Sequence, residues 1–184
     1  MKKTLITLAI GLGLASNAAF AAETGSIRFY GTITAGPCNI QVVDPISKQP
    51  LDRVDMGNPA ASSFVDIGDE ATSRPFGLMV NPGAGCIIDP TVPVRVTFSA
   101  VHGGAGAGGA LYGLESGTGS ATNVALTIKD DTATAIPNGV PSKEYSLDAT
   151  DPTIMLFSAA YKSTAVGVTA GAANTDVGFS VDIP

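Results

Sequence analysis

Residues 171–184 read GAANTDVGFSVDIP and contain the clearest side-chain periodicity in this sequence. Apolar residues occupy every second position, namely Val177, Phe179, Val181 and Ile183. The positions between them hold Gly178, Ser180 and Asp182. Because successive side chains of a β-strand point to opposite faces, this pattern predicts a strand whose apolar face lines a core.

A second alternating stretch lies near the N-terminus, where residues 25–38 read GSIRFYGTITAGPC. Its apolar row contains Ile27, Phe29, Ile33 and Ala35, with Gly31 in the middle of the row. Glycine inside a strand suits a crowded point where no side chain fits. The strand could belong to a closed sandwich with the C-terminal strand, or it could complete the core of another molecule. Periodicity alone does not distinguish these two arrangements.

The sequence between these two stretches favours an all-β fold. Helical periodicity is scarce, whereas short β-branched runs recur between clusters of Gly, Pro, Asn and Asp. We expect strands at residues 27–35, 39–43, 64–67, 76–80, 92–98, 124–129, 154–161, 166–169 and 177–183. Their number and spacing favour a sandwich. Residues 101–110, VHGGAGAGGA, are predicted to form a mobile loop, and Pro137-Asn138-Gly139 to form a turn.

Residues 1–21 have the three parts of a secretory signal peptide. Lys2 and Lys3 precede an apolar run from Leu5 to Leu14, and the segment ends in Ala19-Phe20-Ala21. The apolar run is too short to span a bilayer, and no later run is long enough, so we expect no transmembrane segment in the mature chain. Cleavage is expected after Ala21, with Ala22 as the alternative.

Charge and cysteine content agree with an exported protein. Removing Lys2 and Lys3 from the 10 basic residues leaves 8 against 16 acidic ones, a formal charge of −8, which argues against a nucleic-acid partner. The two cysteines, Cys38 and Cys86, follow the signal peptide and predict one disulfide. A closed loop of roughly 50 residues corresponds to about 4 kcal/mol of stabilisation.

Candidate catalytic and metal-binding residues are few. His102 is the only histidine and lies among glycines, where no neighbour in sequence fixes its tautomer or position, so a hydrolase function would depend on this residue alone. The acidic groups at 66–70 and 130–131 lack the spacing of a calcium loop and are interpreted as solvated faces rather than weak cation sites. We therefore predict no enzyme activity, no cofactor and no bound metal.

Several motifs together resemble a type 1-type fimbrial (pilin) subunit of the chaperone-usher pathway. GSIRFYGTI followed by Cys38 resembles that family's donor strand and first cysteine, and Cys86 stands where its second cysteine would fall. Residues 119–130, GSATNVALTIKD, resemble its central strand, and residues 170–183, including Gly171, resemble its terminal motif. The chain departs from the family at its end, where Ile183-Pro184 replaces the usual penultimate tyrosine.

This resemblance implies an immunoglobulin-like sandwich that lacks its seventh strand. It implies a signal peptide at 1–21, a donor-strand extension at 22–36 and a pilin domain at 37–184. The implied donor face contains Ile27, Phe29, Gly31 and Ile33, and the implied acceptor groove is walled by Val177, Phe179, Val181 and Ile183. The resemblance also implies a structural subunit of a bacterial surface fimbria that supports adhesion. Such a subunit is captured by a periplasmic chaperone, assembled at an outer-membrane usher and joined to neighbouring pilins by donor-strand exchange.

The alternative function is a secreted β-sandwich that binds carbohydrate. Sugar-binding surfaces usually need exposed aromatic faces, whereas this sequence has no tryptophan and only 6% aromatic residues. Its four tyrosines do not cluster in the sequence. The composition therefore favours the fimbrial interpretation.

Overall fold

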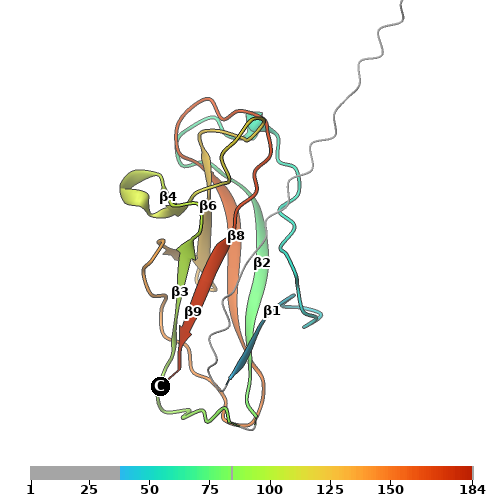
Figure 1. Ribbon diagram of the computed structural model, residues 1–184, viewed down its shortest axis with the longest axis vertical. Helices are drawn as coiled ribbons and strands as arrows, with labels where there is room; N and C mark the ends of the chain where they lie inside the picture. Colours follow the sequence, from blue (N-terminus) through green and yellow to red (C-terminus); the bar gives the residue numbers. More distant parts are fainter. Residues whose placement is uncertain (1–37, 84, 184) are drawn as a thin grey trace, which may run out of the picture.

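The computed structural model describes residues 38–83 and 85–183, and within them the chain is almost entirely β-structure (Figure 1). The predicted signal peptide, the donor-strand extension with Ile27, Phe29, Gly31 and Ile33, and Pro184 lie outside the described residues. The strands are β1 (Asn39–Val43), β2 (Glu70–Asn81), β3 (Arg95–Ala100), β4 (Gly104–Ala105), β5 (Leu111–Tyr112), β6 (Val124–Asp130), β7 (Ala135–Ile136), β8 (Thr153–Ser163) and β9 (Val177–Asp182). Two short 3-10 helices are η1 (Ala61–Ser63) and η2 (Ala107–Gly109).

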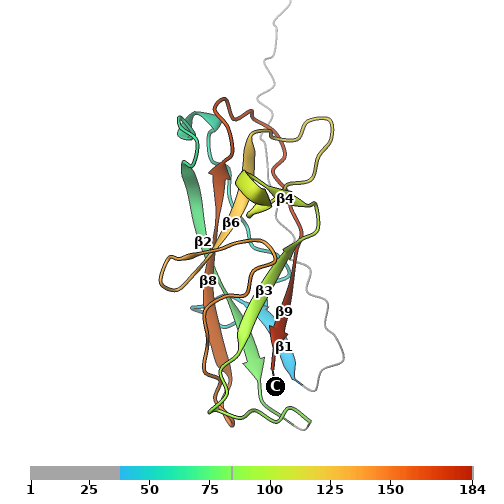
Figure 2. The same ribbon diagram turned by 90° about the vertical axis from the view of Figure 1, so that its left-hand side faces the viewer.

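The strands form two antiparallel sheets that face each other. The larger sheet has seven strands in the order β1-β2-β8-β6-β5-β4, with β7 paired to β6, and the smaller sheet contains β3 and β9. Figure 2 shows the smaller sheet lying across the larger one. The all-β, incompletely closed immunoglobulin-like fold is thus confirmed. No helix in the described part of the chain is long and apolar enough to cross a membrane.

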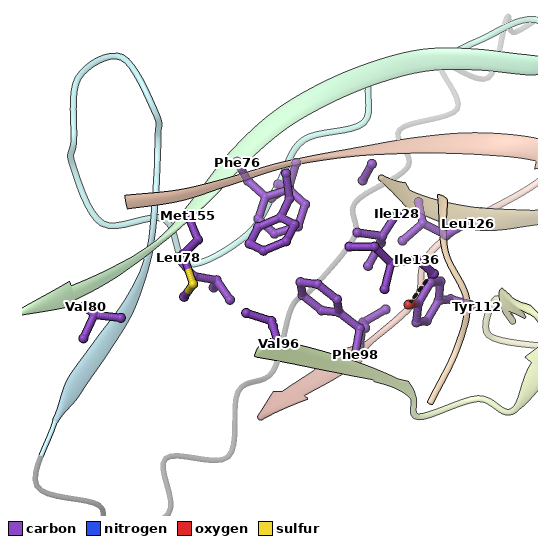
Figure 3. Packing of buried hydrophobic residues seen from close by; sticks show 14 of the residues in the cluster. Phe76, Leu78, Val80, Val96, Phe98, Tyr112, Leu126, Ile128, Ile136 and Met155 are labelled. Atoms are coloured by element: carbon purple, nitrogen blue, oxygen red, sulfur yellow. Dashed lines mark hydrogen bonds between the residues drawn. The ribbon is translucent and has the colours of Figure 1, made fainter. Parts of the chain in front are cut away.

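Aromatic rings join the two sheets at the centre of the core (Figure 3). The ring of Phe98 on β3 meets that of Phe157 on β8 edge to face, with centroids 5.1 Å apart. Phe157 in turn stacks on Phe76 of β2 at 5.6 Å. All three side chains are buried. Tyr112 is also buried, and its hydroxyl donates to the carbonyl oxygen of Ile136 at 2.9 Å, so its polar atom has a partner within the core.

Two of the predicted strands are wrong. Residues 64–67 form a turn, because the carboxylate of Asp69 accepts hydrogen bonds from the backbone N–H groups of Val65 and Asp66, both at 2.7 Å. Only Phe64 of this run is buried, whereas Val65 and Ile67 are exposed. A short apolar run therefore predicted a strand where a side-chain hydrogen bond fixes a turn instead.

Residues 166–169 are the second incorrect strand, and they form part of the long connection from β8 to β9. Gly167 there has a φ of 74°, which interrupts an extended conformation. Thr169 reaches the neighbouring loop instead of a strand, and its hydroxyl accepts the backbone N–H of Thr122 at 2.9 Å.

The glycine-rich segment 101–110, predicted to be a mobile loop, contains the short elements β4 and η2. β4 pairs with β5 through Gly104↔Tyr112 and Ala105↔Leu111. A Cβ atom on Gly104 would lie 2.4 Å from the carbonyl oxygen of Gly109, so the glycines allow backbone to approach backbone. The predicted turn at Pro137–Gly139 is confirmed by the hydrogen bond from Val140 N–H to the Pro137 carbonyl at 3.0 Å.

Candidate functional site

Strand β9 has one edge that no strand of the described residues pairs with. Its other edge pairs with β3 over six residues, from Arg95↔Asp182 to Ala100↔Val177. The second edge of β3 is covered by the segment 139–145. Ser142 N–H donates to the Val96 carbonyl, and Val94 and Tyr145 exchange two backbone hydrogen bonds. The smaller sheet is therefore closed on the β3 side and open on the β9 side.

The core-facing side chains of β9 become more exposed to solvent from the start of the strand to its end. Val177 at its start is completely buried, whereas Phe179, Val181 and Ile183 are only half-buried although they pack against the core cluster. The strand predicted from the alternation is confirmed at Val177–Asp182, with Ile183 just beyond it. Apolar side chains at an unpaired strand edge are the usual setting for strand addition.

Strand β1 is an edge strand of the larger sheet at the same end of the sandwich (Figures 1 and 2). Its outer edge is paired only at its C-terminal end, where Leu51 N–H donates to the Val42 carbonyl oxygen at 2.8 Å. Ile40 and Val42 of β1 lie opposite Val80 and Leu78 of β2, and both pack against the core cluster while remaining half-buried. We call the half-buried apolar residues of these two edges the open edge; it contains Ile40, Val42, Phe179, Val181 and Ile183. Sequence patterning identified the β9 part of this set but not the β1 part, because β1 does not alternate cleanly.

The predicted disulfide is present and reinforces β1. Cys38 precedes β1 directly, Cys86 follows β2, and their sulfur atoms are 2.01 Å apart across a sequence separation of 48. β1 pairs with β2 from Asn39↔Asn81 to Val43↔Gly77. The covalent link therefore fastens the N-terminal end of an edge strand, whose C-terminal end also pairs with residues 50–51.

An apolar cavity of about 220 Å³ lies beside the β8–β9 connection. Phe64, Tyr161 and Val168 contribute to its wall. The hydroxyl of Tyr161 donates to the carbonyl of Ala173 at 2.8 Å, and burial, followed by the nearby charge of Asp55, raises the pKa of this tyrosine to about 12. The hydroxyl stays protonated and already has its partner, so the cavity offers apolar surface rather than a reactive group.

Gly171, which the sequence singled out as part of the terminal motif, lies in the wall of this cavity and has a structural reason for its identity. A Cβ atom there would lie 2.5 Å from the backbone nitrogen of Ala121 and 2.6 Å from the carbonyl oxygen of Gly119. The next residue, Ala172, donates its N–H to Gly119 and accepts one from Ala121. The connection thus packs backbone to backbone just before β9 begins.

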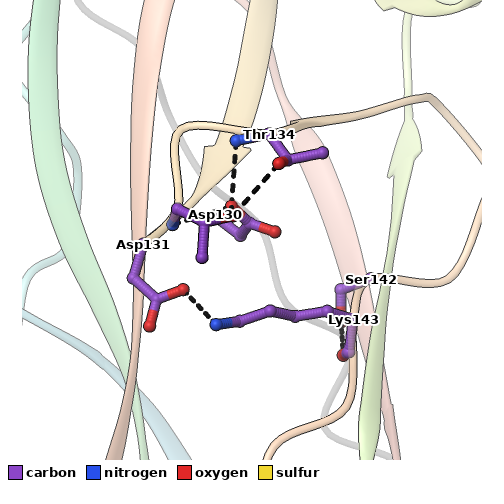
Figure 4. Close-up of polar contacts among 6 residues, drawn as sticks. Asp130, Asp131, Thr134, Ser142 and Lys143 are labelled. Carbon is purple, nitrogen blue, oxygen red and sulfur yellow. Dashed lines mark hydrogen bonds and ion pairs between the residues drawn. The ribbon is translucent and has the colours of Figure 1, made fainter.

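The acidic groups noted in the sequence have partners in the described structure. Glu70 pairs with Lys129 and with Lys162, the latter at 3.0 Å. Asp130 accepts from the backbone N–H of Thr134 at 2.9 Å and closes a turn at the end of β6 (Figure 4). Figure 4 also shows Asp131 paired with Lys143. Turn and ion-pair roles account for these carboxylates. Asp130 is buried, at 5% exposed, so the solvated-face interpretation is wrong for this residue.

His102 lies exposed in a loop, as expected, but it meets two acidic residues from distant parts of the chain. Its Nε2 atom lies 3.5 Å from a carboxylate oxygen of Asp176 and 3.7 Å from one of Glu115. The three residues are far apart in the sequence, so no local pattern could indicate this cluster. None of the three belongs to the open edge.

Comparisons with known proteins agree on one family. A family model described as fimbrial protein matches residues 27–183. Long polar fimbria protein A of Salmonella typhimurium is 31% identical over 183 residues, covering 98% of this chain and 96% of that protein. The type-1 fimbrial protein, A chain, of Escherichia coli K12 is 30% identical, with 98% and 97% covered.

Solved structures of fimbrial proteins are also similar to this chain. The crystal structure of a Burkholderia pseudomallei antigen and type I fimbria protein is similar with a TM-score of 0.55 and 29% identity, over 87% of this chain and 98% of that one. The P pilus rod subunit PapA has a TM-score of 0.54 over 80% of this chain and 99% of that one. At 17% identity, this second similarity concerns the fold alone.

Proposed function

This chain belongs to the fimbrial protein family, and from that premise we propose that it polymerises by donor-strand exchange through the open edge. As a fimbrial subunit it is a cell-surface protein and not an enzyme. The proposal assigns the acceptor role to the groove beside β9 and the donor role to the N-terminal extension at residues 22–36 of a neighbouring subunit. The observation that supports it most directly is the unpaired edge of β9, with Phe179, Val181 and Ile183 half-buried beside it.

The residues of the extension suit this role. Ile27, Phe29 and Ile33 share one face of an alternating stretch, and burying them would contribute about 1.5–3 kcal/mol each before ordering costs. The sum is similar to the whole stability of a typical domain, about 5–15 kcal/mol. Added main-chain hydrogen bonds to β9 would supply affinity, and the alternating side chains would supply register. A joint of this kind would be durable.

The open edge also gives a physical reason why such a subunit would need a chaperone and an usher. A lone subunit with an uncovered open edge is prone to aggregate, because unpaired strand edges with apolar side chains template association. We therefore propose that a periplasmic chaperone covers the edge after export and that an outer-membrane usher exchanges the chaperone for the next subunit's extension. The relatives named as fimbrial proteins support a role in a surface fibre, and we propose that the assembled fibre serves in adhesion.

The substitution Gly31→Ile tests the donor assignment. A branched side chain at the crowded point of the donor face should prevent insertion into a neighbour's groove, while the subunit's own groove still binds a chaperone. The matched control is Thr32→Ile, which places the same side chain on the opposite face of the extension. The measurement is the SDS-resistant ladder of surface-sheared protein, which collapses to one band after heating in acid.

Wild-type protein and Thr32→Ile should give the ladder, whereas Gly31→Ile should give monomer in complex with the chaperone. Removal of residues 22–35 should likewise yield a chaperone complex that cannot act as donor. Normal polymers from Gly31→Ile would disprove the donor assignment. A wild-type protein that runs only as a monomer would instead favour a secreted binding module.

A further inference from the structure

We propose that His102, Glu115 and Asp176 form a binding site for a divalent transition-metal ion of the zinc type. One ligand atom from each residue lies within 4.8 Å of the other two. His102 follows β3 by two residues, Asp176 immediately precedes β9, and Glu115 follows β5. The site thus connects one end of the smaller sheet with the segment that follows β5 of the larger sheet.

The distances suit direct coordination by one ion. The Nε2 atom of His102 is 3.5 Å from an oxygen of Asp176 and 3.7 Å from an oxygen of Glu115. A tetrahedral Zn²⁺ ion with ligand distances of about 2.0–2.2 Å separates its ligand atoms by about 3.3–3.5 Å. The carboxylate oxygens of Asp176 and Glu115 lie within 4.8 Å of each other, so side-chain movements of about 1 Å or less would bring all three ligand atoms onto one ion. Solvent would take the fourth position because Glu115 is about half exposed, at 48%.

Charge also favours a divalent cation. Two carboxylates with a neutral imidazole carry a charge of −2, and no lysine or arginine of the described chain forms an ion pair with Glu115 or Asp176. The side chain of Asp176 is only 14% exposed, which makes an uncompensated carboxylate there unfavourable. An imidazole with two carboxylates suits Zn²⁺ better than Ca²⁺, which takes six to eight oxygen ligands.

Backbone hydrogen bonds hold the three segments in place before any ion binds. Val101 N–H donates to the Asp176 carbonyl at 3.1 Å, next to His102. Glu115 N–H donates to the Asn174 carbonyl at 2.8 Å, and Gly113 N–H donates to the Gly103 carbonyl at 2.9 Å. A Cβ atom on Gly113 would lie 2.6 Å from the Gly103 oxygen, so the chain approaches itself closely here. An ion would bind a largely preformed site and would fasten the start of β9.

Calorimetric titration with ZnCl₂ tests the site on the mature protein, in the assembly state in which it is recovered and after chelator treatment and dialysis. We expect one ion per chain, much weaker binding of CaCl₂ and MgCl₂, and a melting temperature that rises with zinc and falls again with EDTA. His102→Ala and Asp176→Asn should each weaken zinc binding by at least about tenfold, because loss of even an outer-shell partner costs about 10–100-fold. The matched control is Asp151→Asn, an exposed acidic residue outside the cluster that should leave binding unchanged.

Two outcomes would overturn the proposal. One is zinc affinity that is equal in wild type, His102→Ala and Asp176→Asn. The other is absence of zinc binding by the wild type, and equal destabilisation by His102→Ala and Glu115→Gln would then make the cluster an ion pair only. Circular dichroism confirms that each variant is folded, and Glu115→Gln decides the question if His102→Ala is not. The site does not depend on donor-strand exchange, so a failure of either proposal leaves the other standing.

Discussion

The two sheets of the sandwich differ in how completely their strands are paired. In the larger sheet, β8 lies between β2 and β6, and its core residues Met155, Phe157 and Ala159 are all buried. In the smaller sheet, β9 pairs with β3 and with no other strand of the described residues, and beyond Val177 its core face is half-buried. Strand β9 therefore lacks both a second paired strand among the described residues and full burial of its core-facing side chains. Within the described residues, the sandwich is incompletely closed at β9.

The largest effect is expected at β9, where the strand edge is unpaired among the described residues and the apolar side chains are only half-buried. Val181→Glu would place a carboxylate in the groove beside β9, where an incoming strand would have to bury it at high cost. We expect complete loss of the SDS-resistant ladder. Ser180→Glu is the matched control, because Ser180 is exposed on the opposite face of β9 and should leave the ladder intact. Polymer formation by Val181→Glu at the wild-type level would disprove the proposed acceptor role of this face of β9.

A second experiment compares two phenylalanines that lie directly opposite each other in the smaller sheet. Phe98 and Phe179 are cross-strand partners, but Phe98 is 1% exposed whereas Phe179 is half-buried. Phe98→Ala should lower the free energy of unfolding by about 3–5 kcal/mol, because it leaves a cavity among Phe76 and Phe157. Phe179→Ala should cost less in a subunit whose groove is empty.

Urea unfolding measures both variants in a subunit completed by its own residues 22–36 fused through a flexible linker after Pro184. In that form Phe179 would be covered by the fused strand, so the cost of Phe179→Ala should rise toward that of Phe98→Ala. Equal costs with and without the fused strand would mean that the strand does not cover Phe179.

A third, smaller effect is expected at the connection that leads into β9. Gly171→Ala adds a Cβ atom within 2.6 Å of backbone atoms of Gly119 and Ser120, and backbone cannot move aside as a flexible side chain does. We expect destabilisation by about 1–3 kcal/mol in the same unfolding experiment. Gly83→Ala is the control, because a Cβ atom there has nothing within 4 Å, and it should change stability by no more than about 0.5 kcal/mol. Similar effects of the two substitutions would contradict the close packing at Gly171.

The sequence predicted the strands whose pattern is local and missed features that depend on distant partners. Strand β9 was predicted within one residue, and β1 was predicted at its observed bounds. β2 extends further back than expected, through Pro75, which interrupts a central strand. Pro75 is tolerated because β1 pairs with β2 only from Gly77 onward, so β2 is an edge strand at Pro75.

The candidate site also contains features that the local sequence predicted and features that it missed. Alternation identified the apolar face of β9, and an even cysteine count behind a predicted signal peptide identified the disulfide. The partly buried residues of β1 and the cluster around His102 were missed, because they depend on which loops and edges meet in space. Contacts between segments far apart in the sequence leave no local periodicity to detect.

The smallest predicted effect compares ion pairs on the two sheets. Glu70 of β2 pairs with Lys162 of β8 and Lys129 of β6, which links three strands of the larger sheet. Burial alone would raise the pKa of Glu70, but the hydrogen bonds donated by Lys129 and Lys162 outweigh burial and hold the pKa below its usual range. Because the pKa is lower in the folded than in the unfolded state, the stabilisation is present above the unfolded value and is lost as the pH falls through the folded one.

Glu70→Gln should therefore lower the free energy of unfolding by about 0.2–1 kcal/mol at neutral pH and by nothing measurable below the folded-state pKa. The control is Glu144→Gln, which removes the more exposed pair with Arg95 of β3 in the smaller sheet and should have the weaker effect because solvent screens it more fully. Urea unfolding at two pH values, in the strand-completed subunit, measures both variants. Because Gln keeps the shape of Glu but not its charge, a loss at Glu70 that did not depend on pH would contradict stabilisation by the ion pairs with Lys129 and Lys162.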